Sequence, residues 1–379
     1  MQHYHYIFTG SGLSALMTVY EMMVSGKFQN HSILLIDESP KKVNDRTWCF
    51  WEDSPIFENI ISMKWQSALF ADNNLKRILN LEPYQYKMIS GLAFYNLIFE
   101  MLSQQDNIHF VHKKVIDFHE LGNHCVVKTE AESYTCNKIF NSIYNPELVK
   151  KQNKYPLLQQ HFIGWFIKSK EPLFNPECAT FMDFSVAQKG NTRFMYVLPT
   201  SATEALIEYT LFSKDLLPKE EYETEIKNYI QKLGITEYEI LEKEQGNIPM
   251  TSYPFWKHNT QNILNIGSAG GWTKASTGYT FKNTTKKSKQ LVAFLASESD
   301  FRKFHKKDKF WWYDLLFLDV LSRRNDLGSK VFSALFKKGN PALIFKFLDE
   351  ETRFWEDLQV IWKCPKGLFV NALLMRIFK

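Results

Sequence analysis

The chain has 379 residues, a formal net charge of +5, 45% hydrophobic residues and 23% charged residues. These proportions are typical of a folded globular protein and exclude an intrinsically disordered chain. The net charge is too small to indicate a nucleic-acid partner, and five widely spaced cysteines with no CxxC pair argue against a disulfide framework or a zinc site.

Targeting and metal-binding patterns are missing as well. The N-terminus opens into a strand pattern without a charged region and an apolar stretch, which argues against a cleaved signal peptide. No apolar run reaches the roughly 18 residues of a membrane-spanning helix, so we expect any membrane contact to be made from one side. HExxH, GxSxG and GxxxxGK[ST] are absent, and no metal site is expected.

A dinucleotide-binding pattern opens the chain. Residues 4–8 form a short apolar strand, and the glycine-rich turn GSGLSA follows at 10–15. Residues 13–24 then repeat apolar side chains with the period of a helix, and a second apolar strand ends at Asp37. This order of strand, GxGxxA turn, helix, strand and acid is the fingerprint of a Rossmann-like dinucleotide site, and it fits FAD and NAD alike.

Each residue type in this pattern has a physical role. The first glycine makes the tight turn, the second lets the backbone approach a pyrophosphate at the helix N-terminus, and the small alanine permits close helix–strand packing. The terminal acid accepts a hydrogen bond from a ribose hydroxyl, and the next residue is the alternative because a strand end can shift by a residue or two. The candidate dinucleotide-binding residues are Gly10, Gly12, Leu13, Ala15, Asp37 and, as the alternative acid, Glu38.

The middle of the chain reads mainly as strands. Between residues 60 and 199 short apolar strands alternate with turns, with a helix near 91–103. QQHFIGWFIKSK, ATFMDFSVAQ and TRFMYVLPTSATEALIEYTLFS predict successive strands of a sheet that covers a substrate. Glu208 lies in the middle of the last strand. Burying an ionised carboxylate without a partner is costly, so we expect Glu208 to be paired, neutralised or functional.

A second glycine-rich turn follows an apolar strand at 263–266. Many FAD proteins complete their pocket with such a turn, whose backbone amides reach the pyrophosphate. The segment resembles the GDAAH…P…G segment of flavoprotein hydroxylases, although Ser268 stands where those proteins have Asp. The candidate cofactor-binding residues of this segment are Gly267, Ala269, Gly270, Gly271, Thr277 and Gly278.

Beyond residue 290 the sequence becomes helical and aromatic. The segment DFRKFHKKDKFWWYDLLFLDVL joins a basic cluster to four aromatic residues, and CPKGLFVNALLMRIFK is apolar with basic residues at its edges. Basic residues beside amphipathic aromatic residues fit helices that lie in a lipid headgroup layer. A helical cap whose apolar face packs on the core is the alternative.

Seven segments between about residue 8 and residue 281 carry a resemblance to a known family. They are GSGLSALM, NDRTWCFWE, QQHFIGWF, FMDFSVAQ, FMYVLPTSATEALIEYTLFS, GNIPMT and IGSAGGWTKASTGYTF. In these segments the chain resembles the flavin-dependent lycopene cyclases of carotenoid-making bacteria and plant plastids, most closely a Bacteroidetes-like branch. TWCFW and LIEYT are specific to this resemblance, whereas the GxGxxA turn is not.

The resemblance implies an intramolecular lyase that closes the ψ-end groups of lycopene to β-ionone rings, through γ-carotene to β-carotene, with no net redox change. It implies FAD in its reduced form as the cofactor, with NAD(P)H or another donor as the reductant. Lycopene, related acyclic carotenes and a membrane surface are the implied partners. The implied location is the cytoplasm, with peripheral attachment to the inner face of the cell membrane.

The resemblance also implies roles for individual residues. The family's FLEET-type motif supplies an essential acid, and the matching segment here is LIEYT, which makes Glu208 the catalytic acid/base. A carboxyl in an apolar cavity has a raised pKa, which suits it to deliver a proton at neutral pH. Asp183 is a second candidate acid or base. Because carbocations are attracted to aromatic faces, the candidate substrate-lining residues, each equally suited to core packing, are Trp48, Phe50, Trp51, Trp165 and Tyr196.

Another segment, FLDEET at 347–352, is closer to the family motif in its letters. It lies in the charged C-terminal part with helix-type spacing. We therefore interpret Glu350 and Glu351 as solvated helix charges and not as catalytic groups.

We expect an α/β (α+β) fold in which a Rossmann-like FAD-binding domain is interleaved with an antiparallel-sheet substrate domain. The FAD-binding domain would comprise residues 1–150 and 245–295, and the substrate domain residues 151–244. Residues 296–379 would form a helical, membrane-facing C-terminal part. The alternative functions are an FAD-dependent monooxygenase or reductase acting on an isoprenoid lipid, and a carotenoid- or flavin-binding module without catalysis.

Overall fold

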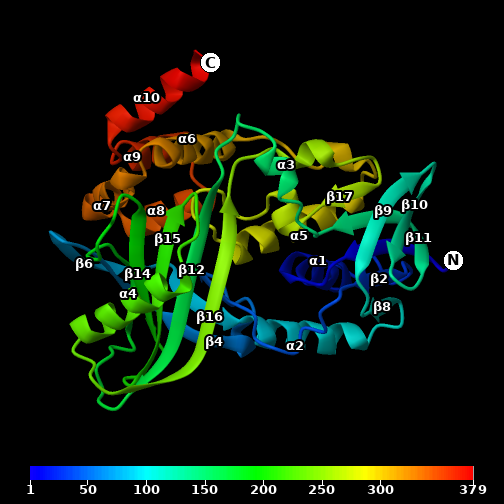
Figure 1. Cartoon of the computed structure of the whole chain (residues 1–379). Helices are drawn as coiled ribbons and strands as arrows, with labels where there is room; N and C mark the ends of the chain where they lie inside the picture. The colour runs from blue at the N-terminus through cyan, green and yellow to red at the C-terminus, as the bar shows by residue number, and fades with distance from the viewer. Residues whose placement is uncertain (379) are drawn as a thin grey trace.

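A computed structural model describes residues 1–378 of the chain, and its first sheet is Rossmann-like (Figure 1). The strands of this sheet are β1 (His3–Thr9), β2 (Ile33–Ile36), β8 (Ile108–Val111), β9 (Val115–Leu121), β10 (His124–Thr129), β11 (Ser133–Asn141) and β17 (Ile263–Asn265). Their order is β8-β2-β1-β11-β10-β9, and β17 pairs with the end of β11. The β8, β2, β1, β11 and β17 strands are parallel, whereas β9, β10 and β11 form an antiparallel meander.

Three helices cover one face of this sheet. They are α1 (Leu13–Val24), α2 (Gly91–Ser103) and α5 (Phe281–Leu295). Phe8, Leu35 and Phe140 of the strands pack with apolar side chains of these helices in one buried core. The four residues of β2 are all buried, because both faces of a parallel sheet are covered and its strands are therefore continuously apolar. The α1 helix spans the residues that its apolar period predicts.

The second sheet contains the strands that the sequence assigns to the substrate domain. Its strands are β5 (Ser67–Asp72), β6 (Leu75–Asn80), β12 (Leu158–Ser169), β13 (Cys178–Asp183), β14 (Thr192–Pro199), β15 (Glu204–Ser213) and β16 (Tyr238–Met250). Their order is β16-β12-β15-β14-β13-β5-β6, and β14 and β15 form a hairpin whose turn includes Thr200 and Ser201. The α4 helix (Lys219–Lys232) packs on one face of the sheet around Ile226 and Ile230. The other face bears a separate core that includes Phe181, Phe194 and Phe212.

Smaller elements connect these parts. A third sheet of order β3-β7-β4 is built from β3 (Thr47–Glu52), β7 (Gln85–Ser90) and β4 (Ile61–Trp65). The short α3 helix spans Glu147–Lys150. Single 3-10 turns occur at Glu58–Ile60, Phe255–His258, Gly267–Gly270, Phe301–Lys303 and Asn325–Leu327.

The C-terminal part is helical, as predicted, and packs against the second sheet (Figure 1). It consists of α6 (Lys309–Arg323), α7 (Gly328–Lys338), α8 (Pro341–Leu348), α9 (Phe354–Ile361) and α10 (Lys366–Ile377). Phe332 and Phe345 join the core that contains Phe181. The α10 helix is attached to α6 by the Arg376 guanidinium, which donates two hydrogen bonds, of 2.5 and 2.8 Å, to the buried Asp319 carboxylate.

The expected fold class is confirmed, but sheet membership differs from the expected domain boundaries. Residues 67–80 lie in the second sheet although they belong to the range 1–150 assigned to the FAD-binding domain. The β16 strand stays in the second sheet as far as Met250, five residues beyond position 245. None of the helices within residues 1–378 combines the length and the apolar character needed to cross a bilayer.

Candidate functional site

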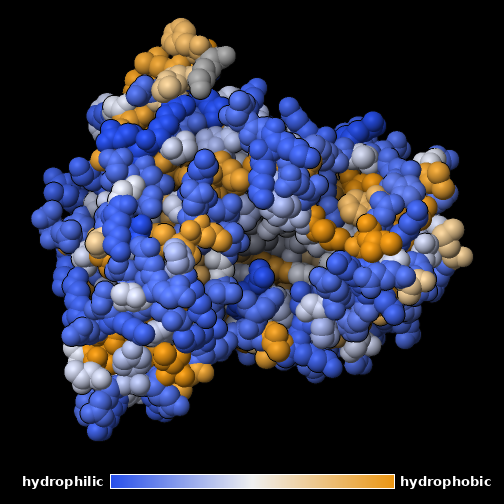
Figure 2. Space-filling model, viewed as in Figure 1, coloured by the Kyte–Doolittle hydropathy of each residue, from blue (hydrophilic) through white to orange (hydrophobic). Residues whose placement is uncertain are grey.

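A cavity of about 350 Å³ lies where the dinucleotide turn, the second glycine-rich turn, the third sheet and the second sheet meet. Figure 2 shows the surface hollowed between the two halves of the molecule. Its wall includes Gly12 at the start of α1, Trp48 on β3, Glu208 on β15 and Gly267 of the second glycine-rich turn. Segments that are more than 250 residues apart in the sequence therefore build one site.

The first glycine-rich turn has the conformation that its residue types predict. Gly10 has φ +106°, and a Cβ atom there would lie 2.2 Å from Ser142 Oγ, so only glycine fits. Gly12 is the N-cap of α1, no side chain caps this helix end, and a Cβ atom at Gly12 would meet nothing within 4 Å. The uncapped N–H groups of α1 thus begin at open space on the cavity wall, which is the arrangement that binds a phosphate.

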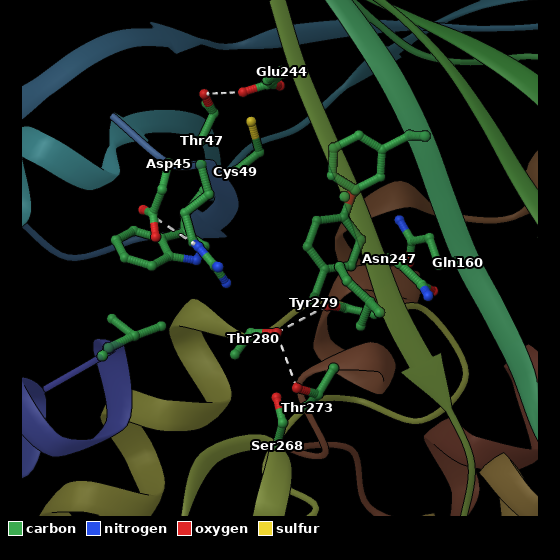
Figure 3. A pocket seen from close by; sticks show the side chains of 18 of the residues that line it. Asp45, Thr47, Cys49, Gln160, Glu244, Asn247, Ser268, Thr273, Tyr279 and Thr280 are labelled. Carbon is green, nitrogen blue, oxygen red and sulfur yellow. Dashed lines mark hydrogen bonds and ion pairs between the residues drawn. The ribbon is translucent and has the colours of Figure 1, made fainter. Parts of the chain in front are cut away.

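The second glycine-rich turn packs directly on the first. Gly267 has φ +57°, and a Cβ atom there would lie 2.4 Å from Ser14 Oγ on α1. A Cβ atom at Gly270 would lie 2.1 Å from the carbonyl oxygen of Asn265, and one at Gly278 would lie 1.9 Å from Gln160 Oε1. The glycines therefore allow two backbone turns and the second sheet to approach each other closely around the cavity. Ser268, which replaces the hydroxylase Asp, also lines the cavity (Figure 3).

Three polar atoms on the cavity wall have no hydrogen-bond partner among residues 1–378. They are Gln160 Oε1, Thr277 Oγ1 and Thr284 Oγ1, and their residues are all more than nine-tenths buried. Buried polar groups in native proteins are nearly always hydrogen-bonded, so these atoms fit a polar ligand that supplies the missing partners. Together with the empty space at Gly12, they make the cavity suitable for a dinucleotide.

The remaining predicted cofactor residues divide between the cavity lining and positions outside it. The Asp37 carboxylate accepts hydrogen bonds from the Ser11 N–H at 2.7 Å and from the Ser11 hydroxyl at 3.1 Å, and so fixes the first turn. Glu38 is exposed and does not line the cavity. Ala15, Ala269 and Gly271 also lie outside the cavity lining, whereas Leu13, Gly267, Thr277 and Gly278 belong to it.

Glu208 faces the cavity from the centre of the second sheet. Its side chain is 8% exposed, and its Oε1 accepts a hydrogen bond from the buried Thr210 hydroxyl. In the strand register Glu208 lies opposite Gly164 on β12 and opposite Tyr196 on β14. Burial raises the pKa of the Glu208 carboxyl, and the nearby Glu244 carboxylate raises it further, while the Thr210 hydrogen bond has a smaller opposing effect.

A second carboxyl at the site was missed by sequence reasoning. Glu244 on β16 lies opposite Gly164 on the other side, is partly buried and lines the cavity. Its Oε2 accepts a 2.7 Å hydrogen bond from the Thr47 hydroxyl of β3, as Figure 3 shows. Burial raises its pKa, the Thr47 hydrogen bond opposes this, and Glu242 adds a smaller increase. The feature of the sequence that could have indicated Glu244 is its position two residues before GNIPMT, one of the segments that carry the family resemblance.

Aromatic side chains complete the wall beside the two carboxyls. Trp48 and Tyr196, two of the candidate substrate-lining residues, line the cavity, and Tyr86 and Tyr279 join them. The Tyr279 hydroxyl lies 3.2 Å from the Tyr86 hydroxyl and 3.5 Å from the Tyr196 hydroxyl. Burial raises the pKa of each of these three tyrosines, so the phenols are neutral at ordinary pH. Neutral aromatic faces next to a protonatable carboxyl suit a substrate that becomes cationic.

Four other predicted side chains lie outside this cavity. Phe50 stacks on Phe281 with ring centroids 4.4 Å apart, and Trp51 stacks on Phe345 at 4.7 Å. Trp165 follows Gly164 and therefore points to the opposite face, where it packs with α4. The fourth, Asp183, accepts a 2.7 Å hydrogen bond from the Tyr229 hydroxyl of α4 on that same face.

The interpretation of Glu350 as a solvated helix charge is wrong. Glu350 lies after the end of α8 with φ +63°, and its carboxylate is 2.9 Å from the ammonium of Lys274. Lys274 has only 4% of its side chain exposed and also contacts the Asp314 carboxylate at 3.0 Å. This buried ion cluster holds the second glycine-rich turn against the C-terminal helices. The neighbouring Glu351 is exposed, as expected.

Comparisons with known proteins agree with this geometry. A lycopene beta-cyclase from Pantoea ananas is 26% identical over 290 residues, which cover 73% of this chain and 71% of that protein. A flavoprotein/dehydrogenase from Cytophaga hutchinsonii has a TM-score of 0.63 at 12% identity and covers 98% of this chain and 99% of its own. A geranylgeranyl bacteriochlorophyll reductase-like protein from Thermoplasma acidophilum has a TM-score of 0.62 at 10% identity, over 99% of this chain and 100% of its own.

The two solved structures show that the fold is shared, whereas the family assignment rests on the sequence. The family described as lycopene cyclase protein matches residues 6–374, which is nearly the whole chain. The chain therefore belongs to the lycopene cyclase protein family.

Proposed function

We propose that this chain is a lycopene beta-cyclase that uses FAD and closes ψ-end groups to β-ionone rings without net redox change. The observation that carries the proposal is the buried Glu208 carboxyl, which faces a cavity walled by a dinucleotide turn on one side and by Trp48 and Tyr196 on the other. Family membership and the likeness to the Pantoea ananas enzyme support the choice of substrate.

The residues present fit FAD. The turns at Gly12 and Gly267 would hold the phosphates, and the unpaired polar atoms of Gln160, Thr277 and Thr284 would find partners on the cofactor. Reduced FAD, when bound, would supply negative charge that stabilises a nearby carbocation. NAD(P)H or another donor would keep it reduced.

Glu208 would supply the proton. Its raised pKa keeps the carboxyl protonated at neutral pH, so it can donate to the terminal double bond of the substrate. The neighbouring double bond then attacks the cation and closes the ring, after which a ring proton leaves. The Thr210 hydrogen bond orients the carboxyl, and the faces of Trp48 and Tyr196 would attract the cation.

We also propose that the protein attaches peripherally to a membrane through α9 and α10. Phe354, Trp355 and Trp362 are 57%, 73% and 69% exposed, and Lys366 lies over the Trp362 ring at 3.3 Å. Figure 2 shows apolar atoms on the projecting C-terminal helix. Exposed apolar side chains next to a cation fit a lipid headgroup layer, beneath which lie the acyl chains that would dissolve lycopene.

The aromatic stretch of α6 contributes less than its sequence suggests. Phe310 is 5% exposed and belongs to the core, and the Trp311 indole N–H donates to the carbonyl oxygen of Ser252 at 3.1 Å. Trp312 is 45% exposed. The alternative interpretation, a helical cap, thus describes most of α6, whereas α9 and α10 present the lipid-compatible surface.

The test is anaerobic conversion of lycopene in liposomes by purified protein with chemically reduced FAD, followed by chromatography and mass measurement. A cyclic carotene of unchanged mass, formed without flavin turnover, is the expected result. A product that differs by hydrogen or oxygen would contradict the proposal and indicate a reductase or monooxygenase. The Glu208→Gln variant should lose cyclisation by at least about 100-fold; unchanged ring closure would contradict the role of Glu208.

A further inference from the structure

Three residues form a row across the second sheet on the cavity face. Gly164 of β12 lies opposite Glu208 of β15 on one side and opposite Glu244 of β16 on the other. Side chains that lie opposite each other in neighbouring strands point to the same face of a sheet. The two carboxyls are therefore separated only by a residue that has no side chain, and both line the same cavity.

The space above Gly164 is occupied by the two glutamates. A Cβ atom built on Gly164 would lie 3.2 Å from Glu244 Cγ, 3.4 Å from Glu208 Cβ and 2.8 Å from Leu206 Cδ1. Gly164 does not have a positive φ, so its backbone does not demand glycine. The absence of a side chain instead gives the two glutamates room to approach each other across β12.

Neither carboxyl has a cation partner within residues 1–378. Glu208 accepts from Thr210, and Glu244 accepts from Thr47. The titratable side chains near the pair on other elements are Cys49 of β3, Tyr86 of β7, Tyr196 of β14 and Tyr279. Glu242 lies on β16 itself. Lys41, Asp45 and Arg46 line the same cavity. Two carboxylates without a counter-ion in such a site oppose each other's ionisation, so we expect one of them to keep its proton before the substrate binds.

We propose that Glu244 is the proton acceptor of the cyclisation and works with Glu208 as a pair that shares one proton across Gly164. This inference rests on the proposed cyclase function and names a second catalytic residue for it. Glu208 donates, and Glu244, which is ionised at that moment, takes the proton that leaves the ring.

The proton balance closes within the pair. The Glu208 O–H bond breaks as a C–H bond forms at the terminal alkene carbon, and the next alkene supplies the electron pair of the ring-closing C–C bond. A ring C–H bond then breaks, its electrons form the new double bond, and the proton goes to Glu244. Transfer of this proton from Glu244 back to Glu208 restores the starting state. No electron is gained or lost. The pair carries one negative charge before and after the cycle and two while the cation is present, so the positive charge on the substrate is matched by the proton that Glu208 has given up.

The experiment compares Glu244→Gln with Glu242→Gln, a matched change on an exposed residue of the same strand. The first readout is the titration of the Glu208 carboxyl, followed as the infrared carboxylic-acid band that Glu208→Gln abolishes. In Glu244→Gln the band should disappear at lower pH than in the wild type, because the neighbouring negative charge is gone. In Glu242→Gln it should move little. This readout needs neither lycopene nor cyclisation.

The second readout is the cyclisation rate, with FAD binding measured for every variant as a check of folding. Glu244→Gln should lose at least about 100-fold in rate, as expected for a removed general base, and Glu242→Gln should stay near the wild type. Wild-type rates in Glu244→Gln would overturn the acceptor role even if the band moved. An unmoved band would overturn the shared proton. If the wild type itself made no cyclic product, the cyclase proposal would fail, and the band would still decide whether the pair shares a proton.

Discussion

The Thr47 hydroxyl of β3 donates a 2.7 Å hydrogen bond to the Glu244 carboxylate of β16. This contact joins the third sheet, which continues from the dinucleotide-binding part of the chain, to the edge strand of the second sheet. It also favours the ionised form of Glu244, because a hydroxyl donor stabilises a carboxylate. One hydrogen bond therefore connects the TWCFW segment to the proton chemistry of the site.

Replacing Thr47 with Val should raise the pKa of Glu244 further, because the hydrogen bond that opposes burial is removed. Glu244 must be ionised to accept a proton, so the acidic limb of the cyclisation pH profile should move to higher pH. We expect a several-fold lower rate at neutral pH. Thr47→Ser, which keeps the hydroxyl, should retain the wild-type profile. An identical profile for Val and Ser would show that the contact has no role in the chemistry.

Gly164→Ala should weaken catalysis without removing any polar group. The added methyl would lie 2.8 Å from Leu206 Cδ1 and 3.2 Å from Glu244 Cγ, so the Leu206 and Glu244 side chains must shift and change the spacing of the two carboxyls. We expect a rate loss of at least about ten-fold, with FAD binding retained. The control is Gly367→Ala in α10, where an added Cβ atom meets nothing within 4 Å. Steady-state cyclisation assays on both variants check this prediction, which a fully active Gly164→Ala would contradict.

Glu208 should make the protein less stable as the pH rises. Its pKa is raised by burial in the folded state, so above pH ~4.3 the unfolded chain loses a proton that the folded chain keeps. Stability falls with pH through the window between the two pKa values, by about 1.4 kcal/mol for each unit that separates them. Glu208→Gln should therefore melt at a higher temperature than the wild type at pH 8, with a smaller difference at pH 5. An equal difference in melting temperature between the variant and the wild type at pH 5 and at pH 8 would show that Glu208 is not held protonated.

Gly12→Leu should separate FAD binding from folding. A side chain at Gly12 would enter empty space at the N-terminus of α1, so it should leave the fold intact and occupy the volume that the pyrophosphate needs. We expect the amount of bound FAD, measured by flavin absorbance after reconstitution, to fall by at least ten-fold. The melting temperature of the variant should stay near that of the wild-type protein without FAD. Normal FAD loading would place the cofactor elsewhere.

The membrane-attachment proposal predicts that the pair of changes Trp355→Glu and Trp362→Glu should weaken binding to liposomes by at least ten-fold. Both side chains are largely exposed, so the folded state loses little packing. Ile116→Glu on β9 is the control, because Ile116 is 60% exposed on the first sheet, away from α9 and α10. Sedimentation with zwitterionic and anionic vesicles provides the measurement. Equal binding of the paired variant and the control would exclude α9 as the contact.

The local part of the fold could be predicted from the sequence because short-range patterns determine it. The α1 helix, the glycine turn at Gly10 and Gly12 and the β14–β15 hairpin follow from apolar period and turn chemistry over a few residues. Glu208 could be singled out because it is a carboxyl in an apolar strand, and the family resemblance suggested its role. Glu244 could not, because its importance depends on β16 pairing with β12, about 80 positions earlier in the chain.

The aromatic residues show a second limit of prediction from the sequence. Trp165 differs from Gly164 by one position, yet it faces α4 while Gly164 faces the cavity, because successive side chains of a strand alternate. Sequence reasoning gave the strand but not which of its faces is the substrate face. Phe50 and Trp51 have the same difficulty, since their stacking partners Phe281 and Phe345 lie more than 200 residues away.

The buried Lys274 ammonium has a consequence for how this protein can be divided. Asp314 of α6 and Glu350 after α8 are its counter-ions, while Lys274 itself belongs to the turn that closes the cavity. A truncation that removes these helices would take both counter-ions from Lys274, and losing the partner of a buried charge costs several kcal/mol. The α6 and α8 helices are thus tied by buried charges to the turn that closes the cavity, and a truncation within them would disturb that turn, whereas surface substitutions on α9 and α10 leave these ion pairs in place.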